Sequence, residues 1–144
     1  MLDRFLKQTT FTSIEDFNQN FCLIVPEDFN FAYDVMDEWA NTAPDRLAMI
    51  WTNDQGLEKR FTFGDLKRES DKAAGYLTSL GISKGDMILL ILKRRYQFWI
   101  TMLALHKIGA VAIPASFLLT KKDDPSMTEA AHEMIDGKAG YREI

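Results

Sequence analysis

The most constraining feature of the sequence is an uninterrupted apolar run over residues 87–92. Because this run shows no polar alternation, it predicts a strand covered on both faces, as in a parallel sheet. Residues 96–107 place apolar side chains at helical spacing, and Gly109 stands where a helix ends in a left-handed turn. A second apolar run, residues 111–113, stops at Pro114, which has no N–H for a strand ladder. Strand, helix and strand predict one right-handed crossover, whose sheet the preceding residues are expected to cover.

A helix and a hairpin are predicted before this crossover. Residues 31–39 carry apolar side chains at helical spacing, and residues 41–45 are typical of a helix end. Residues 47–51 form a short apolar strand pattern, and residues 59–63 alternate basic or polar with aromatic side chains. Turn-forming residues 53–56 join the two strands, so the pair predicts a β-hairpin.

The clearest helix pattern begins at Thr62. Its hydroxyl can accept a hydrogen bond from the amide of Asp65, whose carboxylate lies where the helix dipole favours negative charge. Gly81 ends this helix, and the helix leads into the apolar strand as a second crossover. The sequence therefore predicts an α/β fold with a small mixed sheet, a β-hairpin and two βα crossovers. The apolar face of the helix consists of Leu66, Ala73, Leu77 and Leu80.

The 144 residues are enough for one domain with a core. They divide into a lead-in over residues 1–30, a sheet-forming region over 31–123 and a tail over 124–144. The lead-in predicts one short helix capped by Ser13. The tail carries one short helix pattern over residues 128–135 and then glycine and charged residues, so a loosely held end is expected.

Net charge, apolar runs and cysteine content limit the partners and the cellular location that the sequence predicts. The formal net charge of −4 gives no argument for nucleic acid or an anionic membrane as partner. The longest apolar run has six residues, so no membrane span is expected, and the first ten residues lack the apolar run of a signal peptide. The single cysteine, Cys22, excludes an internal disulfide and is expected to be a buried apolar filler. These features predict a soluble, cytoplasmic protein.

The consecutive cations Lys93, Arg94 and Arg95 are the first candidate site. They follow the predicted buried strand and precede a helix, which is where open α/β sheets bind ligands and where helix amides attract anions. A contact to phosphate or coenzyme A is one interpretation. A solvated basic turn at the sheet end is the other, because clustered charge beside a strand end is common.

The two histidines do not predict a metal site. His106 stands near a helix C-terminus without Cys, Asp or Glu at ligand spacing, so a packing or dipole role is expected. His132 has Glu129 and Glu133 nearby, but a second histidine at zinc-binding spacing is missing.

Aromatic and polar side chains give no catalytic assignment. The large aromatic residues of the sheet region are interpreted as core rather than as a substrate wall. Ser116 and Phe117 follow the last predicted strand and are expected to approach a pocket most closely. The acidic residues are placed on solvent faces or turns, so neither a paired-carboxylate site nor a nucleophile elbow is predicted. The aromatic residues are Phe29, Phe31, Trp39, Trp51, Phe98 and Trp99.

Four blocks of sequence resemble the N-terminal part of the AMP-forming acyl-CoA synthetases. They are VPEDFNFAYDV at residues 25–35, FTFGDL at 61–66, LGISKGD at 80–86 and KIGAVAIP at 107–114. Their order makes the combined resemblance more specific than any single block, and the first block is most similar to the medium-chain branch. The resemblance covers residue 25 to about residue 123, and residues 124–144 do not follow the family pattern.

The resemblance implies an acyl-adenylate-forming ligase fold and ligase chemistry. The complete enzymes use ATP, Mg²⁺ and coenzyme A to convert a carboxylic acid into its acyl-CoA. Their phosphate loop, rich in Ser, Thr and Gly and ending in Lys, is absent here: residues 9–13 contain no glycine, and Lys84, Gly85 and Asp86 are interpreted as a turn. Catalytic and metal-binding residues are therefore not assigned, and this chain alone is expected to be inactive.

Two other interpretations stay open. One is a self-contained, flavodoxin-like module that binds a nucleotide or a partner protein. The other is a structural role, in which the chain is a complementing half that assembles with a separately encoded remainder. A ligase fragment, by contrast, is expected to leave an apolar sheet edge exposed and to associate with itself.

Overall fold

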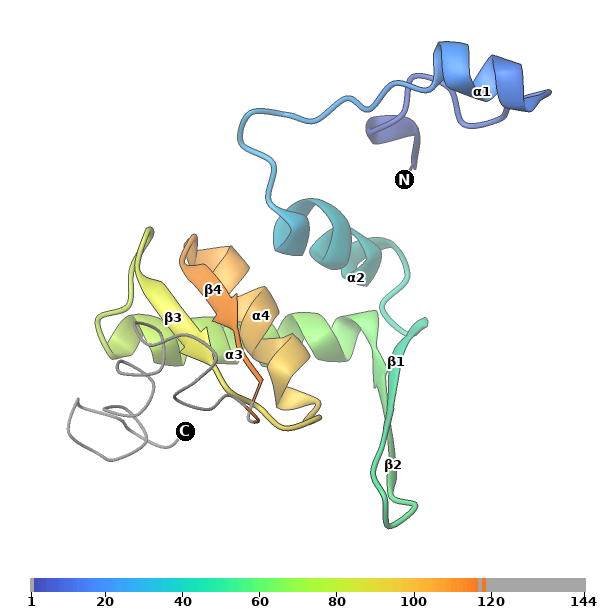
Figure 1. Ribbon diagram of the computed structural model, residues 1–144. Helices are drawn as coiled ribbons and strands as arrows, with labels where there is room; N and C mark the ends of the chain where they lie inside the picture. The colour runs from blue at the N-terminus through green and yellow to red at the C-terminus, as the bar shows by residue number, and fades with distance from the viewer. Residues whose placement is uncertain (1, 117, 119–144) are drawn as a thin grey trace. The chain divides into compact units, whose positions relative to one another are not determined.

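The computed structural model describes residues 2–116 and residue 118 (Figure 1). The predicted tail over residues 124–144 lies outside these residues. The chain divides into two compact units at residue 30, and the described part of each is treated by itself. None of the described helices is long and apolar enough to cross a membrane.

The first unit contains the short 3-10 helix η1 (Leu2–Arg4) and the helix α1 (Ile14–Asn20). Ser13 caps α1 as predicted, because its Oγ accepts a hydrogen bond from the Asp16 amide at 3.1 Å. Apolar contact in the unit comes mainly from ring pairs: Phe17 lies 5.0 Å from Phe11 and 4.8 Å from Phe21 between ring centroids. The expectation that Cys22 is buried is wrong, since this small unit leaves it exposed.

The second unit begins with a helix in two forms. Its first part, η2 (Ala32–Asp37), is π-helical, and α2 (Glu38–Thr42) continues it as an α-helix. The helix predicted over residues 31–39 is therefore present and extends three residues further. A π-helical turn holds one more residue per turn than an α-helical turn, and such turns are frequent at functional sites.

The predicted β-hairpin is confirmed. Strand β1 (Leu47–Thr52) pairs antiparallel with β2 (Glu58–Thr62). The side chain of Asn53 closes the turn by accepting hydrogen bonds from the amides of Gln55 and Leu57, at 3.0 and 2.9 Å.

Thr62 ends β2 and caps α3 (Phe63–Ser79), as predicted. Its Oγ1 accepts a hydrogen bond from the Asp65 amide at 3.1 Å, and its own amide donates to Asp65 Oδ2 at 3.0 Å. This reciprocal arrangement satisfies two amides that a helix start otherwise leaves unpaired. The chain therefore passes from strand to helix without a loop.

The predicted crossover is formed by β3 (Met87–Leu90), α4 (Gln97–Ile108) and β4 (Val111–Pro114). The two strands pair in parallel, from Met87 opposite Val111 to Leu90 opposite Pro114. Gly109 ends α4 with a φ of +73°, the left-handed conformation expected from its position. The α/β class predicted from the sequence is thus confirmed.

Two expectations about the sheet are wrong. Strand β3 stops at Leu90, and Met87 is 74% exposed, so β3 is not covered on both faces. The described strands form two separate two-stranded sheets instead of one mixed sheet, so β2, α3 and β3 do not make a second crossover within a single sheet. The hairpin contacts the segment after β3 through side chains: the Tyr96 ring lies 5.4 Å from Trp51 and 5.1 Å from Phe61.

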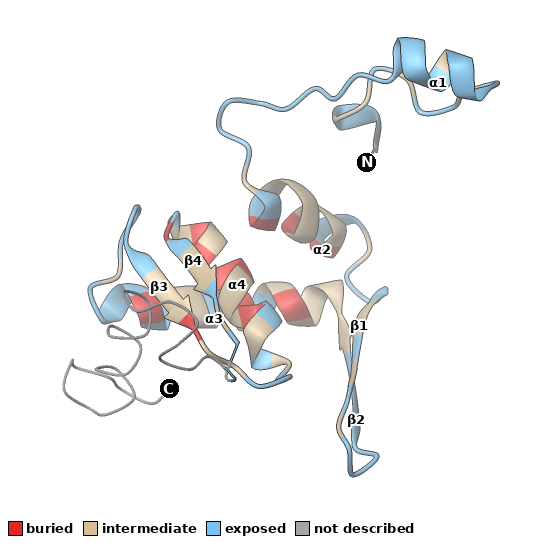
Figure 2. Ribbon diagram, in the orientation of Figure 1, coloured by how far each residue is buried: buried red, intermediate tan, exposed pale blue. Residues whose placement is uncertain are grey.

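The core of the second unit lies between α3 and α4 (Figure 2). One cluster packs Leu77 and Leu105 against Leu90, and the other packs Leu66 and Leu103 beside η2. The predicted face of α3 is mostly correct, although Leu80 at its end is exposed.

Three of the aromatic side chains interpreted as core are exposed in the structure: Phe29, Phe31 and Trp99, the last at 57%. Trp39, Trp51 and Phe98 are half-buried. Trp99 shows why helical spacing was misleading, because α4 is apolar over nearly its whole circumference and only part of that surface meets α3 and the strands.

Candidate functional site

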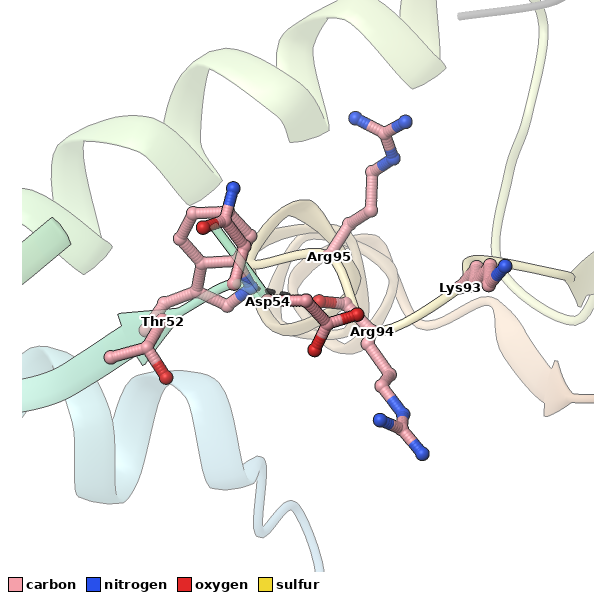
Figure 3. A pocket seen from close by; sticks show the side chains of 7 residues that line it. Thr52, Asp54, Lys93, Arg94 and Arg95 are labelled. Carbon is pink, nitrogen blue, oxygen red and sulfur yellow. Dashed lines mark hydrogen bonds between the residues drawn. The ribbon is translucent and has the colours of Figure 1, made fainter. Parts of the chain in front are cut away.

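A pocket of about 430 Å³ lies between the end of β1 and the turn that follows β3 (Figure 3). Its volume falls within the usual range for small-molecule sites. Its lining residues come from two segments: Trp51, Thr52, Asn53 and Asp54 from the hairpin, and Lys93, Arg94 and Arg95 from the turn. The structure therefore places the predicted basic cluster at a pocket.

The two walls of the pocket are joined by side chains of the hairpin. Trp51 donates a hydrogen bond from its indole Nε1 to the carbonyl oxygen of Arg94 at 2.7 Å. On the neighbouring strand, Lys59 Nζ donates to the hydroxyl of Tyr96 at 3.0 Å, with its ammonium 4.5 Å from that ring. These contacts fix the basic turn against the hairpin, although the two segments are about forty residues apart in sequence.

Arg94 has an unusual backbone conformation. Its φ of +44° makes it the one non-glycine residue with a positive φ among the described residues. This left-handed region is uncommon for side chains other than Asn, Asp and His. The side chains of Arg94 and Arg95 leave the turn in opposite directions (Figure 3), and both are exposed.

The other candidate residues do not join this pocket. Ser116 is exposed, and its Oγ accepts a hydrogen bond from the amide of Leu118 at 3.1 Å instead of lining the pocket. His106 lies in the last turn of α4, where its ring meets Phe31 edge-on at 6.2 Å between centroids, consistent with a packing role. Phe117, Glu129, His132 and Glu133 lie outside the described residues.

A buried ion network was not predicted from the sequence. The side chain of Lys107, 2% exposed, contacts Asp37 Oδ1 at 2.9 Å and donates a hydrogen bond to Asp71 Oδ1. Lys67 Nζ contacts the other oxygen of each carboxylate at 3.1 Å. The network joins η2, α3 and α4.

Asp37 is only 5% exposed, so the expectation that every acidic residue lies on a solvent face or a turn is wrong. The position of Lys107 in the sequence already indicates a buried ion pair. Lys107 follows Leu103 by four residues and shares its face of a strongly apolar helix, and a lysine in such a place needs a carboxylate partner.

The network lowers the pKa of the Asp71 carboxyl. Partial burial alone would raise this pKa, but hydrogen bonds from Lys107 and then from Lys67 outweigh it. In the same way, the hydrogen bond to Asp71, followed by that to Asp37, raises the pKa of the Lys67 ammonium.

A pH dependence of stability follows from the lowered pKa of Asp71. Because that pKa is lower in the folded than in the unfolded chain, the stabilisation is complete above about pH 4 and is lost as the pH falls through the folded value. We expect Asp71→Asn to lose less unfolding free energy than the unchanged chain between pH 6 and pH 3, measured by urea unfolding. Equal losses would contradict this assignment.

Neither a metal-ligand cluster nor a glycine-rich phosphate loop is found among the residues that the structure describes. They hold no group of three His, Cys, Asp or Glu side chains that could bind a metal ion. Lys84 and Gly85 belong, as expected, to a turn closed by Asp86, whose Oδ2 accepts a hydrogen bond from the Ser83 amide at 2.8 Å.

Comparison with known proteins gives concordant matches. The family model described as "AMP-binding enzyme" matches residues 36–131. Rat mitochondrial acyl-coenzyme A synthetase ACSM5 is 39% identical over 113 residues, and human mitochondrial ACSM3 is 38% identical over 119 residues. These alignments cover 74% and 78% of this chain.

Among solved structures, the N-terminal subdomain of Klebsiella oxytoca NpsA aligns with a TM-score of 0.58 and 29% identity, over 69% of this chain and 25% of that one. The chain spans about a fifth of the length of the two synthetases, 20% in each case. The matches thus relate it to one part of much longer proteins.

Proposed function

Because the chain belongs to the AMP-binding enzyme family, we propose that it supplies the N-terminal part of an AMP-forming acyl-CoA synthetase. The observation that carries this proposal is the identity of 38–39% to acyl-CoA synthetases over about three quarters of the chain. The proposed substrate of the complete enzyme is a carboxylic acid, with ATP, Mg²⁺ and coenzyme A as the other participants.

The proposed chemistry activates a carboxylic acid by replacing its poor leaving group, the carboxylate oxygen, with a good one, AMP. A carboxylate attacks the α-phosphorus of ATP, which releases pyrophosphate and forms an acyl adenylate. The thiol of coenzyme A then attacks the acyl carbon, and AMP leaves. Neither a glycine-rich loop with its lysine nor a metal-ligand group is found in the described residues, so we propose that this chain does not perform adenylation by itself.

The test measures AMP release. The purified chain is incubated with ATP, Mg²⁺, coenzyme A and short, medium and long fatty acids, alone and mixed with a separately produced chain that carries the later family motifs. We expect no AMP above the blank from the chain alone, and AMP from the mixture. AMP released with a fatty acid by this chain alone would contradict the proposal.

The exposed side of β3 and β4 supports association with such a remainder or with a second copy. Met87 and Val111 are paired in register, and they are 74% and 48% exposed. In the described residues each of these strands has one strand neighbour, so each also has an edge open to pairing. Sedimentation of the mixture would report whether the two chains form one complex.

The flavodoxin-like alternative is less well supported. Such a fold needs one continuous, mostly parallel sheet, whereas β3 and β4 are the one parallel pair in the described residues. The cytoplasmic location stays a prediction, and the two relatives are named as mitochondrial proteins.

A further inference from the structure

We propose that the pocket lined by Trp51 and Arg94 binds a small molecule that carries two separate phosphate groups. This inference rests on the pocket and its charges alone, and it stands independently of the proposed enzymatic function.

The two arginines of the pocket differ from the other described arginines in having no side-chain partner within the described part of the chain. Each of the other four described arginines is already engaged: Arg60 and Arg68 pair with carboxylates, while Arg4 and Arg46 lie over aromatic rings. Arg94 and Arg95 form no ion pair with a carboxylate of the described residues. Their charges are therefore not neutralised by a carboxylate of the described residues, although the chain as a whole has a formal net charge of −4.

The turn that carries Arg94 and Arg95 is held in place by a side chain of the hairpin. The Trp51 indole holds the carbonyl oxygen of Arg94 at 2.7 Å, and the backbone at Arg94 is in the left-handed region. Uncommon backbone conformations persist only where surrounding contacts impose them, and they cluster at ligand sites. The turn therefore presents its cations from a fixed backbone, which lowers the entropy lost when an anion binds.

The chemistry and the directions of the two arginine side chains indicate the kind of ligand. Guanidinium groups match phosphate oxygens in a bidentate way, so phosphate is the anion that these side chains suit well. Because Arg94 and Arg95 point in opposite directions from the pocket, one phosphate would not engage both groups (Figure 3). A molecule with a phosphate near each arginine would do so, and Thr52, Asn53 and Asp54 offer polar groups to the part between them.

The experiment is calorimetric titration of the full chain with fructose 1,6-bisphosphate, whose two phosphates are far apart, and with inorganic phosphate. We expect the bisphosphate to bind more tightly. Arg94→Gln and Arg95→Gln should each weaken its binding roughly tenfold, the factor of one charge-assisted hydrogen bond. Arg60→Gln is the matched control, because Arg60 is an exposed arginine outside the pocket, and it should leave the affinity unchanged.

Three results would overturn the inference: no bisphosphate binding at millimolar concentration, equal affinity for inorganic phosphate, or equal weakening by Arg60→Gln. Thermal unfolding of each variant separates lost binding from lost folding. Arg95→Gln serves as the second test should Arg94→Gln disturb the strained backbone.

Discussion

Replacing Lys107 by methionine is expected to lower the free energy of unfolding by about 3 kcal/mol, the low end of the range for breaking a buried ion pair. Methionine keeps much of the aliphatic length but removes the ammonium that lies 2.9 Å from Asp37. Lys67 still contacts Asp37, which is why the low end applies. Urea unfolding followed by circular dichroism measures the change.

Two comparisons make this prediction specific to burial. Lys72→Met removes a lysine whose pair with Glu69 is largely exposed, and it should cost less than about 1 kcal/mol. Combining Lys107→Met with Asp37→Asn should cost less than the sum of the single changes, because neither charge is then left buried alone. A cost for Lys107→Met no larger than that for Lys72→Met would show that the network adds nothing to stability.

Replacing Leu105 by alanine is expected to cost about 2–5 kcal/mol, the range for a large apolar side chain removed from a packed core. Leu105 is fully buried, and its cluster joins α3, α4 and both parallel strands. The cavity would thus open where the two helices meet the sheet. Thermal and urea unfolding both report the loss.

Leu80→Ala is the matched control, since Leu80 follows α3 and is exposed. It should cost much less than Leu105→Ala, because little apolar area is taken from the core. Similar costs for the two variants would mean that the core between α3 and α4 is not what stabilises this unit.

The helix cap, the helix end and the hairpin turn could be predicted because each depends on residues that are close together in the sequence. The cap at Thr62 and Asp65 involves four consecutive residues, and the helix end at Gly109 needs only a residue that tolerates a positive φ. The hairpin depends on a turn whose closing side chain, Asn53, lies within it. Each of these features is specified within a few positions of the chain.

Contacts between distant residues explain what could not be predicted. The pairing of Lys107 with Asp37 links positions seventy residues apart, and Asp37 is the last residue of the π-helical segment η2. The pocket likewise depends on the bond from Trp51 to Arg94. The number of sheets was mispredicted because apolar runs identify strands but do not identify which strands pair.

The shared residue between β2 and α3 also has a mechanical consequence. Since Thr62 is at once the end of the strand and the cap of the helix, this junction has no flexible joint, and the hairpin tilts together with the first turn of α3. A displacement of the hairpin is therefore expected to be transmitted directly to the start of α3. Because Trp51 and Lys59 also bond to the segment after β3, a displacement of the hairpin is expected to move that segment with it.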